Sequence, residues 1–181
     1  MMLTPDQRPD DTGLDLLRGA FPPEWREPAL GYEAVGTWES ENGVKLPEPY
    51  RTFVAEVSNG CGLGPAEDGG LQPLGWLPSG WPGLGTRQPG RPFPLQEAWP
   101  WEDDDSVDTE GDQRIDAVHN HGSIVLGAED GQSFWLLVTA GARRGEVWLV
   151  ADVGAGPVQT DEPWGFLEWV QRWQSGQGWW V

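Results

Sequence analysis

Cysteine, lysine and histidine are scarce in this chain of 181 residues. Its single cysteine, Cys61, cannot form an intrachain disulfide, so a reducing compartment is expected. Lys45 is the only lysine among 11 basic residues, which stand against 29 acidic ones and give a formal net charge of −18. The chain therefore lacks the basic surface that binds DNA, RNA or anionic lipid. We expect no direct nucleic-acid or membrane partner, whereas a basic protein is favoured because opposite net charges steer association.

Long hydrophobic runs are also missing. No unbroken run is longer than residues 134–138, which are far fewer than the roughly 20 residues that a membrane-spanning helix needs. The first seven residues show no basic stretch followed by an apolar one, so they do not have the pattern of a signal peptide. The sequence predicts a soluble, cytoplasmic protein.

Catalytic motifs are nearly absent. The chain contains no Gly-x-Ser-x-Gly, Walker, His-Glu-x-x-His or Cys-x-x-Cys pattern, and Gly83-Leu84-Gly85 lies in a proline-rich stretch rather than between a strand and a helix. His119 and His121 would share one face of a strand, but two histidines and one cysteine leave too few soft ligands for a structural zinc site. A surface pair at the start of a strand is the favoured interpretation. We expect no enzyme activity, no cofactor and no metal.

Tryptophan, glycine and proline are abundant. The 26 glycines and 17 prolines are typical of loop-rich or disordered chains, but disordered chains lack large aromatic residues, and this one has 13 tryptophans. Each buried tryptophan removes roughly 150–250 Å² from water. The composition therefore predicts a folded domain with long loops.

Helices are predicted near both ends of the chain. Residues 1–13 are polar and are expected to form a flexible arm. Near the end of this stretch, Asp11 or Thr12 is expected to cap a short helix that stops near Gly19. A second helix is predicted over residues 32–41. A third begins at Pro47 and ends at Asn59-Gly60. Its apolar stripe has helical spacing and comprises Tyr50, Phe53, Val54 and Val57. The closing helix starts at residues 160–163, and its stripe comprises Phe166, Trp169, Val170 and Trp173.

Strands are predicted between these helices. The clearest are residues 123–126, 132–139 and 146–150, and weaker signals mark 70–76 and an edge strand at 92–99. Both faces of the 132–139 strand are apolar, so it is expected to be central and covered on both sides. The sequence thus predicts an α+β fold with N-terminal helices, a central and mostly antiparallel meandering sheet, and a C-terminal helix packed on it.

Acidic residues are densest at 102–112, where seven of eleven residues are Asp or Glu. A calcium loop needs alternating ligands around a turn glycine, and this run lacks that register. Two interpretations stay open: a solvated, self-repelling loop, and a recognition patch for a basic partner, which the neighbouring tryptophans favour. The hypothesis of partner binding includes Trp99, Trp101, Glu102, Asp103, Asp104, Asp105, Asp108, Glu110 and Asp112, together with Trp76 and Trp81.

Carbohydrate binding is an alternative for the tryptophans of the middle region. A sugar ring would stack on an exposed indole, and the candidates are Trp76, Trp81, Trp99 and Trp101. The competing interpretation, that these rings pack the core and the loops, is favoured.

Several motifs together resemble the SUKH superfamily. Residues 43–53, ending in Ser58-Asn59-Gly60, are similar to its LP-x-x-Y-x-x-F…NG helix. Residues 70–74, 122–127, 130–138 and 145–148 resemble its strands in order, and residues 166–169 resemble its closing helix. The resemblance covers residues 32–174, is nearest to the SMI/KNR-type branch, and departs from it in the long Trp- and Pro-rich stretch 76–121.

The resemblance implies a single α+β domain over residues 14–181, a protein partner and no catalytic residues. Fungal members of that branch regulate cell-wall assembly, and many bacterial members are immunity proteins of polymorphic toxin systems. The expected function is therefore an immunity protein that neutralises a basic toxin domain, such as a nuclease. The alternatives are a regulatory or scaffolding interaction domain without a toxin and, from another class, a carbohydrate-binding module or an unrecognised enzyme.

Overall fold

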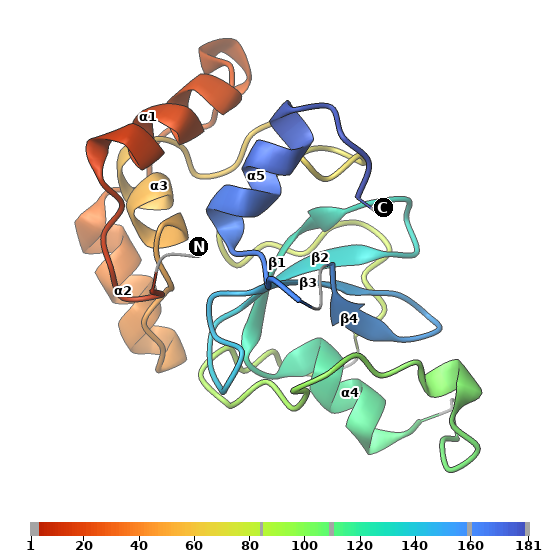
Figure 1. The fold of residues 1–181 in the computed structure, drawn as a ribbon. Coiled ribbons are helices and arrows are strands. Elements are labelled where there is room, and N and C mark those ends of the chain that lie inside the picture. The colour runs from red at the N-terminus through yellow and green to blue at the C-terminus, as the bar shows by residue number, and fades with distance from the viewer. Residues whose placement is uncertain (1–3, 84, 109–110, 159–160, 180–181) are drawn as a thin grey trace.

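Four antiparallel strands form the centre of the computed structural model, which describes residues 4–83, 85–108, 111–158 and 161–179 (Figure 1). The strands are β1 (Ser123–Ala128), β2 (Phe134–Val138), β3 (Val147–Val150) and β4 (Ala155–Pro157). Each pairs with the next in the chain, so the sheet is the predicted meander. Val125 lies opposite Leu136, and Leu136 lies opposite Trp148.

Helices flank the sheet, which confirms the predicted α+β class. They are α1 (Asp11–Ala20), α2 (Tyr32–Asn42), α3 (Tyr50–Glu56), α4 (Gln113–Asn120) and α5 (Phe166–Gln174). Two short 3₁₀ turns are η1 (Pro23–Trp25) and η2 (Trp101–Asp103). The helices α1, α2 and α3 lie together on one side of the molecule, while α4 lies beyond the sheet at the opposite end (Figure 1).

The central strand β2 separates two apolar cores. Trp135 and Leu137 belong to the core shared with α1, α3 and α5, whereas Phe134, Leu136 and Val138 belong to the core on the other face. All five side chains are at most 1% exposed. This confirms the expectation that the strand is central and covered on both sides, which follows from its two apolar faces.

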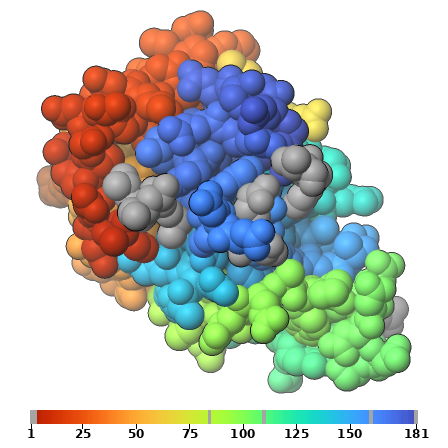
Figure 2. Space-filling model, in the orientation of Figure 1, coloured from red at the N-terminus to blue at the C-terminus, as the bar shows by residue number. Residues whose placement is uncertain are grey.

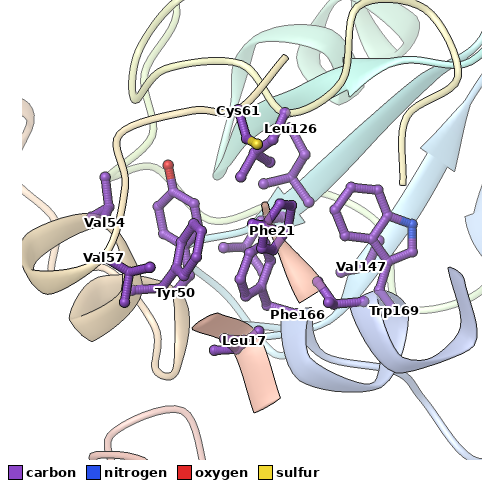
Figure 3. Close-up of a cluster of buried hydrophobic side chains, with 14 of the residues drawn as sticks. Leu17, Phe21, Tyr50, Val54, Val57, Cys61, Leu126, Val147, Phe166 and Trp169 are labelled. Atoms are coloured by element: carbon purple, nitrogen blue, oxygen red, sulfur yellow. The ribbon is translucent and has the colours of Figure 1, made fainter. Parts of the chain in front are cut away.

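Aromatic rings fill the first core (Figure 3). Phe21, at the end of α1, lies 5.0 Å from Phe53 of α3, measured between ring centroids. Phe166 of α5 lies 5.3 Å from the same Phe53 ring, and Trp169 lies 5.6 Å from Trp135 of the sheet. The C-terminal helix therefore packs on the sheet, as predicted.

The second face is covered mostly by the long segment 76–121. Phe93 packs edge-on against Trp148, with 5.1 Å between ring centroids, and Val118 of α4 is fully buried beside them. Gly122 has φ +68°, and a Cβ there would lie 2.6 Å from the carbonyl oxygen of Arg91, so only glycine fits this turn into β1. In Figure 2 the green atoms of this segment lie at the end of the molecule away from the red N-terminal helices.

Loop segments cover both edges of the sheet, where strands were predicted at 70–76 and 92–99. Along β1, the Gln72 amide donates to the carbonyl oxygen of Leu126 at 2.8 Å. Along β4, Trp99 and Ala155 exchange two backbone hydrogen bonds of 2.8 and 3.1 Å. Neither segment forms a strand, because positive-φ glycines interrupt the first and prolines interrupt the second. The two segments still protect edges that would otherwise invite association.

Several element boundaries differ from the prediction: α3 begins at Tyr50 rather than Pro47, and β2 is shorter than the predicted 132–139. The N-cap of α1 is Asp10, whose Oδ1 accepts from the Gly13 amide at 2.8 Å, rather than Asp11 or Thr12. The closing helix begins at Phe166, later than residues 160–163, because Pro163 precedes it and Gly165 is its N-cap. The histidine pair at 119 and 121 was expected at the start of a strand, but residues 113–120 form α4.

The described part of the predicted N-terminal arm contacts the rest of the molecule. The Glu48 amide donates to the Pro5 carbonyl oxygen at 2.7 Å. Arg8 pairs with Glu56 at 3.0 Å, and Asp6 pairs with Arg144 at the same distance. The predicted boundary at residue 13 falls inside α1.

Candidate functional site

The turn before α4 is built around Asp112 and Arg114. Asp112 caps the helix by accepting from the Arg114 amide at 2.9 Å, which satisfies one of the unpaired donors at the helix start. The Arg114 guanidinium returns to the same carboxylate through bonds of 3.1 and 2.9 Å and lies over the Trp99 ring, 5.3 Å from its centroid. These hydrogen bonds from Arg114 lower the pKa of Asp112 to about 2. Asp112 is therefore part of the scaffold.

Asp104 fixes the other side of Trp99. Its carboxylate accepts from the Trp99 indole Nε1 at 3.0 Å, and from the Ser106 hydroxyl and amide at 2.6 and 3.0 Å. The hydrogen bonds from Ser106 and Trp99 lower the pKa of Asp104. Together with Arg114, this carboxylate holds the Trp99 ring in one orientation.

The remaining acids of the segment point outward. The exposed ones among the described residues are Glu102, Asp103, Asp105 and Asp108, while Glu110 lies outside the described residues. Beside them is a hollow of about 420 Å³. It is lined by Pro94, Leu95, Trp99, Asp104, Gln113, Arg114 and Ala117. We call this hollow and the four exposed acids the acidic face.

Trp101 does not belong to the accessible surface, although it was predicted to bind a partner. Its side chain is 2% exposed, and its indole Nε1 donates to the Asp152 carbonyl oxygen at 2.6 Å. Its ring meets Trp99 edge-on, with 5.4 Å between centroids. Trp101 therefore packs the second core and supports Trp99 from behind.

Trp81 and Trp76 lie apart from the acidic face. Trp81 is half-buried between His119 and Phe134, with ring centroids 5.4 and 5.1 Å away, and the Arg87 guanidinium lies 5.1 Å from its ring centroid. Trp76 is 66% exposed and lines three other hollows, the smallest of which also includes Arg87. The predicted set of partner-binding residues therefore divides among three locations.

The histidines do not form the predicted pair on a strand. His119 is on α4, is 8% exposed, and its Nδ1 lies 2.9 Å from the Ile115 carbonyl oxygen, whereas His121 follows the helix. Burial lowers the pKa of both. Cys61 is buried, which raises the pKa of its thiol. Within the described ranges, no group of three His, Cys, Asp or Glu side chains gathers to hold a metal ion.

Two arginines, Arg114 and Arg87, hold parts of this region in place, and neither was predicted from the sequence. Arg114 orients Trp99. Its only signal in the sequence is the spacing Asp112-x-Arg114, which is typical of a helix N-cap. Arg87 donates to the carbonyl oxygens of His119 and Ser123, and burial lowers its pKa to about 10. It lies in a Gly- and Pro-rich loop with no periodicity that would indicate burial.

Comparison with known proteins gives no match to a family model, a curated protein or a solved structure. Over the residues that the structure describes, no helix has the length and apolar character to cross a membrane.

Proposed function

We propose that this chain is a non-catalytic domain that binds a basic protein through the acidic face. The observation that carries the proposal is the hollow beside Trp99, next to which Glu102, Asp103 and Asp105 are exposed. Aromatic rings in hollows are frequent anchors of protein interfaces, and exposed carboxylates around them attract a cationic partner.

The internal contacts of the loop support recognition over a merely solvated loop. A solvated, self-repelling loop would not need ordered contacts to an indole. Here Asp104 and Arg114 hold Trp99 from two sides. A ring that is already ordered loses little conformational entropy on binding, which favours affinity. The loop therefore separates its acids into two groups, those that build the turn and those that face solvent.

Within this proposal, the specific role is that of a cytoplasmic immunity protein of the SUKH type that neutralises a basic toxin domain. The resemblance in sequence order and the net charge of −18 support it. Production of the toxin domain with and without this chain tests the role: immunity requires that co-production restores growth. Binding of a basic partner that is not toxic would favour the regulatory alternative.

Binding kinetics test the acidic face itself. The partner is found by pull-down from the native host and then measured at low and high salt. The variant Glu102→Gln/Asp103→Asn/Asp105→Asn removes three exposed charges and leaves Asp104 in place. We expect slower association and a weaker salt dependence, because these charges act over distances that salt screens within about 8 Å at physiological ionic strength.

Two further variants complete the experiment. Asp11→Asn/Asp15→Asn removes two exposed charges on α1, at the opposite end of the molecule from α4, and should change the association rate much less. Trp99→Ala should raise the dissociation rate, because it removes the anchoring ring. An association rate that the triple variant leaves unchanged would show that the interface lies elsewhere.

A further inference from the structure

Trp76 is the most exposed large apolar side chain among the described residues, at 66%. It lies between two hollows of about 610 and 800 Å³, which share Leu30, Asn59 and Trp76 in their walls. An exposed apolar patch with a polar rim is a common mark of a binding site, so the surroundings of Trp76 decide whether it belongs to one.

Other exposed rings lie beside these hollows. Tyr32, 44% exposed, lines the larger one. Trp25, 55% exposed, lies against Gly62 in the wall of the smaller one, since a Cβ on Gly62 would be 3.1 Å from the Trp25 ring. We call the two hollows with Trp25, Tyr32 and Trp76 the aromatic groove. It is formed by α2, η1 and the segment 59–76, apart from the acidic face.

The support under Trp76 is fixed. The Leu74 amide donates to Asn59 Oδ1 at 2.8 Å, and the Trp76 amide donates to the Pro73 carbonyl oxygen at 3.1 Å. On the facing wall, the Leu30 amide donates to the Val54 carbonyl oxygen of α3 at 2.9 Å. The ring therefore projects from a hydrogen-bonded turn, and the groove does not need a partner to form.

Every charged side chain that lines the two hollows is a carboxylate. Glu27 lines the smaller hollow, and Glu33 and Glu41 line the larger one. Guanidiniums border the two hollows without lining them, and each has other contacts. Arg26 precedes Glu27 and donates to the Phe21 and Arg18 carbonyl oxygens. Arg51 lies over the Tyr32 ring and pairs with Glu39 at 3.0 Å, while Arg87 donates to backbone carbonyl oxygens. The charged residues that line the two hollows are thus all negative, and Arg51 lies over the Tyr32 ring at the border.

We propose that the aromatic groove binds an extended basic peptide segment, with proline or aliphatic residues against the rings and arginine or lysine against the carboxylates. The two hollows lie on either side of Trp76. An extended peptide that crosses this ring could place one side chain in each hollow. Aromatic-lined grooves are a recurrent way to bind extended and proline-rich segments. A neutral saccharide would use the rings but leave the three carboxylates without a role. This site is distinct from the acidic face and does not depend on it.

A random 12-residue peptide library displayed on phage tests the proposal with the full chain as bait. We expect selected peptides to carry net positive charge and proline or aliphatic residues. Labelled copies of those peptides are then titrated by fluorescence anisotropy. Trp76→Ala should weaken binding at least about tenfold, as loss of an anchoring tryptophan does. Glu33→Gln/Glu41→Gln should weaken it less and reduce its salt dependence. Asp161→Asn/Glu162→Gln removes two exposed charges outside the groove and should leave binding unchanged.

Folding and alternative ligands are controlled in the same series. Because Trp76 is exposed, Trp76→Ala should keep the thermal midpoint of the parent protein, and Glu33→Arg/Glu41→Arg keeps all three rings while reversing the charge. The proposal is overturned if no selected peptide depends on Trp76 or if the selected peptides are acidic. It is also overturned if an array of neutral oligosaccharides shows Trp76-dependent binding and the peptides show none.

Discussion

Single residues show how a tryptophan-rich interior uses acidic side chains. An indole N–H that leaves water needs an acceptor. Trp148 Nε1 donates to Glu146 at 2.9 Å, Trp135 Nε1 donates to Glu129 at 2.6 Å, and Trp99 donates to Asp104. Part of the large acidic content is therefore structural, and only the exposed acids, among them those of the acidic face, are available for steering.

Glu146 gives a direct test at this scale. It is 5% exposed, bonds the buried Trp148 indole and pairs with Arg143 at 3.3 Å. Glu146→Leu leaves the indole N–H without its acceptor and should lower the free energy of unfolding by about 1–3 kcal/mol. Glu146→Gln keeps an acceptor oxygen and should cost less. Urea unfolding measures both variants, and equal losses would contradict the role of this hydrogen bond.

His119 predicts a pH dependence. Burial lowers its folded-state pKa below the ordinary value of 6.5. The unfolded chain then binds the proton more readily, so the stabilisation is complete above pH 6.5 and is lost as the pH falls through the lower folded value. The free energy of unfolding should decline from pH 7.5 toward pH 5, and His119→Gln should flatten that decline. Proton NMR should show His119 titrating below pH 6.5. The pKa of His121 is also lowered, although this side chain is much less buried than His119.

At the scale of elements, the helices and strands with strong apolar periodicity were the ones that could be predicted from the sequence. The helix α3 and the strands β1, β2 and β3 were predicted because their apolar spacing is unambiguous. The helix α4 was missed because its eight residues contain few apolar side chains and are stabilised by the Asp112 cap and by Val118 in the core. The strand β4 is only three residues, Ala155–Pro157, and owes its form to Trp99 and β3 on its two sides.

The candidate site was predictable in part. The run of acids and the adjacent Trp99 were visible in the sequence as a patch. Which acids build the turn depends on contacts across the fold, such as Asp104 with Trp99, and no spacing reveals them. The burial of Trp101 follows from the packing of η2 against the second core, and a tryptophan in a polar, acidic stretch gives no sign of it.

The central strand gives the prediction at this scale. Trp135 is fully buried and lies against Trp169 and Trp179, with 5.6 and 5.0 Å between ring centroids. Trp135→Ala should lower the free energy of unfolding by about 3–5 kcal/mol through lost burial and the cavity left behind. Trp25→Ala is the matched control, because its ring is 55% exposed, and it should change stability by less than about 0.5 kcal/mol. Similar denaturant midpoints for the two variants would refute the central position of β2.

At the scale of the whole molecule, two apolar cores pack on opposite faces of one sheet, and the chain around them is predominantly negative. The cores are built by chain segments of different character, regular helices on one face and the loop-rich segment 76–121 with α4 on the other. Both interaction surfaces proposed for this chain combine one face of a helix, α4 or α2, with connecting segments that these cores hold in place. Loops on a rigid scaffold are where binding residues commonly occur.

The net charge of −18 predicts how salt affects stability. Folding brings the carboxylates closer together, so self-repulsion opposes the compact state. Raising NaCl from about 10 to 150 mM shortens the screening length from about 30 to 8 Å and should relieve that repulsion. The ion pairs among the described residues lose little in return, because most have an exposed partner, such as Arg8 or Asp6. The urea midpoint should therefore rise with NaCl. Asp103→Asn/Asp105→Asn should start from a higher midpoint at low salt and rise less, whereas a fall in the parent protein would show that attractive pairs outweigh the repulsion.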